Sequence, residues 1–189
     1  MSDLTYIETY LKETAEIGRT LDRAGVASAI GLLRDLRREG GRLFILGVGG
    51  SAGNASHAVN DFRKIAGIEC YAPTDNVSEL TAWTNDVGWE VVFQRWLQTS
   101  HVGPRDAVRV FSVGGGSAPP SRNLVLAMEG AKEAGARIIA IVSRDGGRAK
   151  ELGDAVILVP VVAQARITPH AEGWQGILWH LLVNAVVEA

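Results

Sequence analysis

Two pairs of histidine and carboxylate side chains occur at spacings that a helix brings to one side. His57 and Asp61 are four residues apart, and Glu172 and His180 are eight residues apart near the C-terminus. On a helix the first spacing places both side chains on one face, and the second turns them by roughly 80°. Such pairs suit a shared metal ion or a proton transfer, although a surface hydrogen bond gives the same pattern.

Two glycine-rich turns follow short apolar segments. Residues 43–46 lead into Gly47 to Ser51, and residues 107–111 lead into Ser112 to Ser117. A strand that ends in glycines lets the backbone approach an anion, and the N–H groups that open the next helix add partial positive charge. One such turn often only closes a βα unit. Two of them predict loops that converge at one edge of a parallel sheet and hold a phosphate.

The elements that must position these residues alternate from residue 42 onward. Apolar runs predict strands near 43–48, 69–72, 107–112, 137–142 and 155–159. Helices are expected near 52–65, 76–84, 89–99, 121–134, 146–152 and 171–187. This alternation predicts an α/β fold with a mainly parallel sheet flanked by helices. Residues 1–189 fit a single domain.

The N-terminal 40 residues stand outside that alternation. One helix is expected from Leu4 to about Ala24, with Ile7, Leu11, Ile17 and Leu21 on one face, and a second from residue 26 to 38 after Gly25. Their apolar stripes can pack on the sheet or against another subunit. A helical hairpin ahead of an α/β core suits an oligomer interface.

The composition excludes several classes of protein. Nineteen basic and 21 acidic residues give a formal charge of -2, so neither nucleic acid nor an anionic membrane is an expected partner. The single cysteine, Cys70, forms no internal disulfide and is expected to be a packed small side chain rather than a nucleophile. Without a signal peptide pattern or an apolar run of about 18 residues, we expect a cytoplasmic protein.

The remaining candidate residues favour structural roles. His101 precedes a Gly-Pro turn and His170 follows Pro169, and neither is expected to bind a metal. Trp174 and Trp179 are expected to anchor the core or an interface. No nucleophile-elbow serine, cysteine pair or P-loop lysine is present, so no nucleotide cofactor is expected.

Taken in order, the motifs resemble those of the sugar isomerase (SIS) domain, in particular phosphoheptose isomerases. The matching segments are Gly49-Gly50-Ser51 with His57 six residues later, Thr74-Asp75, Leu80-Thr81-Ala82, Asn85-Asp86, Ser112 to Ser117, Asp145-Gly146-Gly147 and His180. The resemblance implies a flavodoxin-like homotetramer with active sites at subunit interfaces. It also implies conversion of sedoheptulose 7-phosphate to D-glycero-D-manno-heptose 7-phosphate.

The resemblance assigns roles to particular residues. It implies a substrate loop of Val48, Gly49, Gly50 and Ser51, sugar contacts from Asn85, Asp86 and Glu172, and a phosphate site of Ser112, Val113, Gly114 and Ser117. It implies zinc ligands at His57, Asp61, Glu172 and His180, of which Asp61 and His180 also match the acid/base pair.

Four departures from the family pattern bear on activity. Val48 replaces Asn, Asp61 replaces Glu, Glu172 replaces Gln, and Ser112-Val113-Gly114 replaces a Ser-Thr-Ser run. The lost hydroxyls remove hydrogen bonds worth roughly 1 kcal/mol each, for which Ser121 or Arg122 in the insert from Ala118 to Arg122 is expected to compensate. The altered loop favours an alternative function, a non-catalytic sugar-phosphate-binding or adaptor protein resembling the initiator-associating proteins of replication. The two histidines and two carboxylates favour an enzyme.

Overall fold

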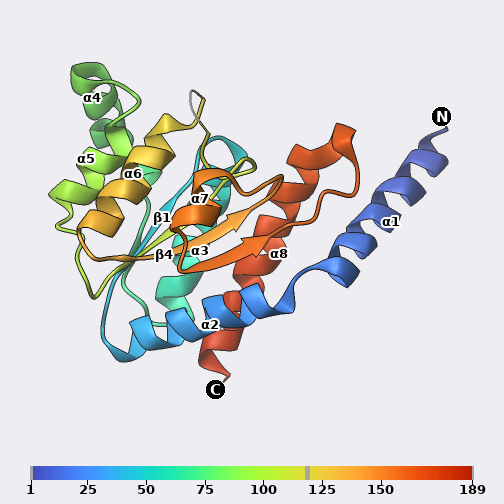
Figure 1. Ribbon diagram of the computed structural model, residues 1–189, viewed down its shortest axis with the longest axis horizontal. Coiled ribbons are helices and arrows are strands. Elements are labelled where there is room, and N and C mark those ends of the chain that lie inside the picture. Colours follow the sequence, from blue (N-terminus) through green and yellow to red (C-terminus); the bar gives the residue numbers. More distant parts are fainter. Residues whose placement is uncertain (1, 118–119, 189) are drawn as a thin grey trace.

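A five-stranded parallel sheet lies between two layers of helices in the computed structural model, which describes residues 2–117 and 120–188 (Figure 1). The strand order is β2-β1-β3-β4-β5 and each neighbouring pair is parallel. The strands are β1 (Leu43–Leu46), β2 (Cys70–Tyr71), β3 (Ala107–Phe111), β4 (Arg137–Val142) and β5 (Ala155–Leu158). The predicted α/β class with a parallel sheet is confirmed.

The central strands are buried on both faces, which explains their continuous apolar sequences. Leu43 of β1 pairs with Ala107 of β3, and Phe111 of β3 pairs with Ile141 of β4. Because the strands are parallel, their carboxyl ends lie at one edge. The loops after β1, β3 and β4 therefore gather there, as the two glycine turns predicted.

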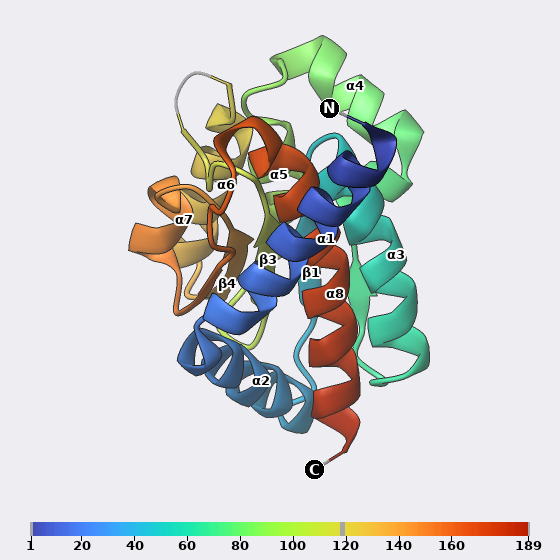
Figure 2. The same cartoon turned by 90° about the vertical axis from the view of Figure 1, so that its right-hand side faces the viewer.

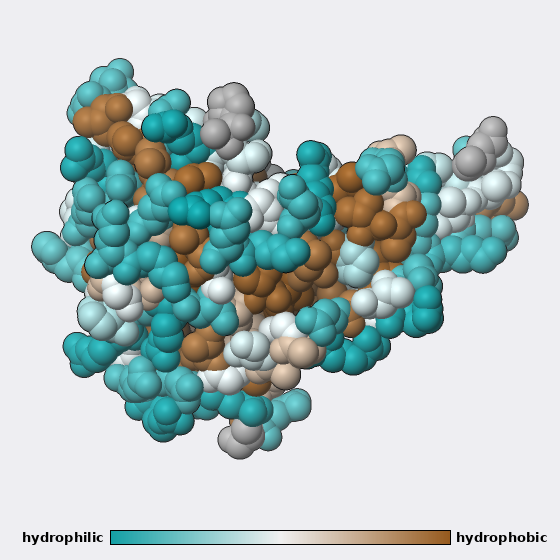
Figure 3. All heavy atoms as spheres, in the orientation of Figure 1, coloured by the Kyte–Doolittle hydropathy of each residue, from teal (hydrophilic) through white to brown (hydrophobic). Residues whose placement is uncertain are grey.

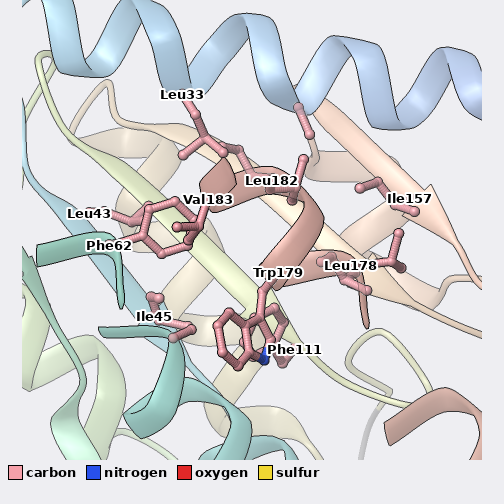
Figure 4. Packing of buried hydrophobic residues seen from close by; sticks show 14 of the residues in the cluster. Leu33, Leu43, Ile45, Phe62, Phe111, Ile157, Leu178, Trp179, Leu182 and Val183 are labelled. Atoms are coloured by element: carbon pink, nitrogen blue, oxygen red, sulfur yellow. The ribbon is translucent and has the colours of Figure 1, made fainter. Parts of the chain in front are cut away.

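Helices cover both faces of the sheet. The first face packs on α2 (Arg23–Arg38), α3 (Gly50–Lys64) and α8 (Ile167–Val187), and its core includes Leu33, Phe62 and Trp179 (Figure 4). The second face packs on α5 (Val92–Thr99), α6 (Arg122–Glu133) and α7 (Gly147–Leu152), with Phe93 and Met128 in its core. The other helical segments are α1 (Asp3–Thr20), α4 (Val77–Val87), η1 (Pro73–Asp75) and η2 (Gln164–Arg166).

The boundary between the two N-terminal helices lies earlier in the chain than expected. α1 ends at Thr20, and Asp22 caps α2 by accepting hydrogen bonds from the backbone N–H groups of Ala24 (2.9 Å) and Gly25 (3.2 Å). Gly25 is therefore not a break between helices but part of the first turn of α2. A Cβ there would clash with the backbone oxygen of Val156 in β5, so this close approach requires glycine.

The C-terminal helix also differs from its expected start. α8 begins at Ile167 instead of residue 171, and the preceding 3₁₀ turn of η2 leads directly into it. Pro169 lies in the first turn of α8, where its missing N–H costs nothing. Within the described residues, no helix has both the length and the apolar character needed to cross a bilayer.

The predicted apolar stripe of α1 is divided between two environments. Ile17 is buried and Leu21, just after the helix, is also buried, whereas Leu4 and Leu11 keep 73% and 62% of their surface exposed. Figures 1 and 2 show why: the last turns of α1 cross α8 and the first turns project beyond the body of the protein. The outer half of the stripe has no cover within the described chain.

A buried ionic cluster attaches α1 to α8. Arg166 donates two hydrogen bonds to the Glu13 carboxylate, and the His170 ring lies 2.8 Å from the same group. The hydrogen bond from Arg166, followed by the one involving His170, lowers the pKa of Glu13 to about 2. Glu13 therefore stays ionised at neutral pH, and His170 has a structural role, in agreement with its expected exclusion from metal binding.

Arg109 is a costly feature of the core. It lies on the central strand β3 with no exposed surface, and none of its guanidinium nitrogens finds a hydrogen-bond partner among the described residues. The Phe62 ring, 4.6 Å from Cζ, offers a cation–π contact worth about 2 kcal/mol when desolvated. Burial lowers the pKa of Arg109 to about 10, so the core disfavours its charged form.

Replacing Arg109 by Leu should stabilise the protein. The substitution removes a buried unpaired charge and keeps an apolar side chain in its place, so we expect the free energy of unfolding to rise by about 1–4 kcal/mol. Chemical denaturation measures the difference, with the exposed Arg95→Leu as a control expected to change stability by less than about 0.5 kcal/mol. A less stable Arg109→Leu protein would contradict this account of the core.

Candidate functional site

The packing of α3 against α8 brings three of the predicted residues together. His57 and Asp61 lie one turn apart on α3, and His180 faces them from α8. Asp61 Oδ2 is 4.0 Å from His57 Nε2 and 3.7 Å from His180 Nδ1. One ligand atom from each residue lies within 4.8 Å of the other two. The group therefore offers two imidazoles and one carboxylate to a common point.

Trp179 fixes the two imidazole rings. Its own ring is almost fully buried, and the ring centroids of His57 and His180 lie 4.6 and 3.5 Å from it. Trp179 is thus the core anchor that its sequence predicted, and it also supports the site. The side chain of Asp61 is 13% exposed and that of His180 is 51% exposed, so the carboxylate is sheltered while the imidazole remains accessible.

Glu172 lies elsewhere on α8 and is not part of this three-residue group. Its carboxylate lies against Gly50 at the start of α3, so closely that a Cβ on Gly50 would clash with it. The side chain therefore lies next to the first residue of α3, where the partial positive charge of a helix N-terminus favours a carboxylate. The eight-residue spacing alone did not distinguish this location from the one beside His180.

A cavity of about 200 Å³ opens where the loops after β1 and β3 diverge. This is the switch point of the sheet, at which open α/β folds bind ligands. The cavity is lined by Val48, Ser51, Phe111, Ser112, Val113, Gly114, Ser121, Leu124 and Glu172. The predicted substrate loop and phosphate loop thus meet in one place, and we call this space the inner cavity.

The phosphate loop is held rigidly by the turn that follows β4. Ser143 N–H donates to Val113 O (3.1 Å) and Ala149 N–H donates to Gly115 O (2.8 Å). Gly115 has φ +70°, and a Cβ there would clash with the backbone oxygen of Gly146, so only glycine fits. Ser112 Oγ accepts the N–H of Gly115 (3.1 Å) and shapes the loop from within.

The remaining candidates do not line the inner cavity. Gly49 precedes α3 with φ +63°, and Gly50 opens the helix. Asn85 and Asp86 lie exposed on α4, where the Asn85 amide donates to the Asp86 carboxylate at 2.8 Å. Ser117 lines a second space of about 570 Å³, which we call the outer cavity.

Two residues of the insert after the phosphate loop can also be placed. Ser121 lines the inner cavity, whereas Arg122 pairs with Glu90 at 3.1 Å and lines neither cavity. Ala118 and Pro119 lie outside the described residues. The expectation that the insert compensates for lost hydroxyls therefore has support at Ser121 alone.

Sequence reasoning missed Asn54 and Gln175. The Asn54 side chain on α3 donates to the backbone oxygen of Glu172 (3.0 Å) and to Gln175 Oε1 (3.2 Å), so it joins α3 to α8 beside the site. Gln175 is 1% exposed. The only sign in the sequence was that Asn54 is polar and lies three positions before His57. Its hydrogen-bond partners are 118 and 121 residues away in the chain, so the sequence did not reveal them.

Cys70 has no part in the site. It is fully buried on β2, where it pairs with Leu43 of β1, and burial raises the pKa of its thiol to about 12. A thiol that stays protonated is a poor nucleophile. The expectation of a packed small side chain is confirmed.

Comparison with known proteins agrees with this geometry. The family model of the SIS domain matches residues 5–143, which include β1, α3 and the phosphate loop. The chain belongs to the SIS-domain family. The resemblance inferred from the ordered motifs is thus confirmed.

Curated relatives narrow the family. A phosphoheptose isomerase of Rhodospirillum rubrum is 32% identical over 87% of this chain and 85% of the relative. The lincomycin biosynthesis protein LmbN of Streptomyces lincolnensis is 30% identical over 96% of this chain and 69% of its own length. The identity and coverage shared with phosphoheptose isomerases place this SIS protein within their family.

Solved structures share the fold. The phosphoheptose isomerase of Neisseria gonorrhoeae superposes with a TM-score of 0.84 at 23% identity, covering 98% of this chain and 97% of its own. That of Francisella tularensis gives the same TM-score at 20% identity over both full chains. The similarity extends to the N-terminal helices α1 and α2.

Proposed function

We propose that this SIS protein is an aldose-ketose isomerase that acts on a phosphorylated sugar, and that the sugar is sedoheptulose 7-phosphate, converted to D-glycero-D-manno-heptose 7-phosphate. The observation that carries the proposal is the convergence of Asp61 and His180, 3.7 Å apart, on α3 and α8, the two helices whose upstream ends carry Ser51 and Glu172 of the inner cavity. The phosphoheptose isomerase relatives support the choice of substrate.

The proposed mechanism needs a base and an acid near one carbonyl. Asp61 takes the proton from the carbon next to the carbonyl, while His180 gives a proton to the carbonyl oxygen, and an enediol forms. Asp61 then returns a proton to the former carbonyl carbon while the hydroxyl on the first carbon gives its proton to His180, so that the aldehyde forms and both side chains recover their starting protonation. Asp61 is well sheltered, and its Oδ1 accepts a hydrogen bond from Asn60 at 2.7 Å, which leaves Oδ2 directed toward the two imidazoles.

As an alternative form of the site, we propose that zinc binds at the three-residue group; an Asp61 carboxylate held by the metal is a poorer base, so the metal and the acid/base roles compete. Two imidazoles and a carboxylate are a ligand set that zinc accepts, and a fourth position left for water or substrate is typical of catalytic sites. Bound zinc would polarise the carbonyl oxygen of the substrate. His57 would then hold the metal, and Glu172 beside Gly50 would accept hydrogen bonds from sugar hydroxyls in the inner cavity.

The alternative, a sugar-phosphate-binding protein without turnover, is favoured by one observation. Val113 and Gly114 contribute no hydroxyl to the inner cavity where family members have Thr and Ser. A protein of this kind has no need for a base and an acid at the same point. Isotope exchange separates the two functions, because only an isomerase exchanges the carbon-bound proton.

We propose that the protein assembles as a homotetramer through its exposed helical faces. Leu4, Ile7 and Leu11 form the uncovered stripe of α1, and Ile177 and Leu181 are exposed one turn apart on α8. Figure 3 also shows apolar side chains at the surface over α4, a helix that has no buried residue among those described. Apolar faces of this kind mark contacts with another protein.

Turnover should depend on Asp61 and His180. Incubation of the purified protein with sedoheptulose 7-phosphate in deuterated water should give the aldose with deuterium at C2. The single variants Asp61→Asn and His180→Gln should lower kcat at least about 100-fold because each removes one partner of the proton transfer. His101→Gln, a change of the same type at an exposed residue outside the site, should retain activity. Binding of the sugar phosphate without any exchange would support the alternative function instead.

Zinc content should follow the three-residue group. Protein purified with zinc supplied should hold about one ion per chain, and His57→Gln should lose most of it because one of three ligands is removed. Elemental analysis measures this, with His101→Gln again as the matched control. Equal zinc in the wild-type protein and in His57→Gln would place the metal elsewhere.

Assembly should depend on the stripe of α1. Light scattering should give a mass four times the 20.2 kDa of one chain. Leu11→Glu should split the assembly because it puts a charge into an apolar contact, whereas Lys12→Glu, at an exposed neighbouring residue outside the stripe, should not. A wild-type monomer would refute the proposed interface.

A further inference from the structure

The outer cavity adjoins the phosphate loop on the side away from Glu172. It has a volume of about 570 Å³ and is lined by Gly114, Ser117, Arg144, Asp145, Val161, Gln164 and Ile167. Gly114 also lines the inner cavity, so the two spaces meet at the loop. A sugar phosphate that occupies both has two possible places for its charged group.

Electrostatics disfavour a phosphate deep in the inner cavity. The Glu172 carboxylate lies in its wall, and two anions at close range in a sheltered site repel each other. Ser112 Oγ already accepts one backbone hydrogen bond, Val113 and Gly114 have no side-chain donor, and the other hydroxyls in the lining, those of Ser51 and Ser121, carry no charge to balance a phosphate. The inner cavity is therefore better suited to the neutral, hydroxyl-bearing part of the sugar.

Arg144, an exposed residue, lines the outer cavity. Arg144 forms no hydrogen bond or ion pair with any residue in 2–117 or 120–188. The other arginines nearby are engaged: Arg148 with Glu129 and Glu151, and Arg166 with Glu13. Asp145, the acidic residue of this lining, accepts the N–H of Gly147 at 3.1 Å and so directs part of its charge toward the backbone.

The backbone holds Arg144 in a fixed relation to the phosphate loop. The residue has φ +54°, a left-handed conformation that is uncommon and unfavourable for a side chain of this size. Ser143 and Ala149, on either side of it in the chain, both hydrogen-bond to the loop. Strain of this kind at a ligand cavity is a pointer to function.

We propose that Arg144 binds the phosphate group of the substrate in the outer cavity and replaces the hydroxyl donors that the loop lacks at Val113 and Gly114. The phosphate then lies between the Arg144 guanidinium and Ser117, and the carbon chain runs past Gly114 toward Glu172 in the inner cavity. This inference rests on the proposed function, because it takes a sugar phosphate as the ligand.

Substitution of Arg144 by Asn tests the proposal with little risk to the fold, since Asn tolerates a positive φ. Calorimetric titration with inorganic phosphate should show binding by the wild-type protein and a loss of about tenfold or more in Arg144→Asn, because a charge-assisted hydrogen bond is removed. Arg144→Lys should recover part of the affinity. Lys150→Asn, an equal loss of charge at an exposed residue that lines neither cavity, is the control.

Steady-state kinetics supply the second measurement. The KM for sedoheptulose 7-phosphate should rise about tenfold or more in Arg144→Asn while kcat stays within about threefold, because the residue binds the phosphate and leaves the proton transfers unchanged. Phosphate binding that depends on Arg144 without any isomerisation would refute the isomerase and keep this inference. A wild-type protein that binds no phosphate, an unaffected Arg144→Asn variant, or an effect of Arg122→Asn alone would overturn the inference.

Discussion

The packing of α3 against α8 determines where the three residues of the candidate site lie. The two helices carry the imidazoles and the carboxylate of the site, and no single helix brings all three to one point. Trp179 fills the space beneath both rings, and Asn54 connects the helices through a backbone oxygen and a buried amide (Figure 4 shows Trp179 in this core). A shift of one helix along the other would separate Asp61 from His180, so the chemistry depends on this packing more than on any loop.

The sequence predicted the parts of the fold that are local. Alternating apolar runs and glycine turns identified the strands of the sheet and the edge at which the two glycine turns meet, because the carboxyl ends of parallel strands lie at the same edge. The closeness of His57 and Asp61 was predictable for a similar reason, because residues four positions apart lie on the same face of a helix. Helix boundaries were predicted less accurately. Gly25 was expected to separate two helices, whereas it lies in the first turn of α2 and allows the backbone there to approach β5 closely.

Contacts between distant segments were not predictable from spacing. Glu172 and His180 share α8, yet one lies against the start of α3 and the other beside Asp61. Arg109 occupies a position that reads as apolar, and its burial follows only from the strand being central and covered on both faces. The resemblance to SIS proteins supplied the ligand set, but the place of each side chain depends on helix packing, which no short motif encodes.

The packing of α2 along β5 has a consequence for how the protein associates. A parallel sheet has two outer strands whose free N–H and C=O groups can recruit another chain. Here one outer strand, β2, is only two residues long, and the other, β5, is approached by the start of α2 at the carbonyl of Val156. Recruitment of a foreign strand is thus restricted at both borders of the sheet. Copies of the chain are then expected to associate through helical surfaces, whose contacts are reversible and of defined geometry. A change that displaced α2 would expose the edge of β5 and allow fibril-like pairing of strands.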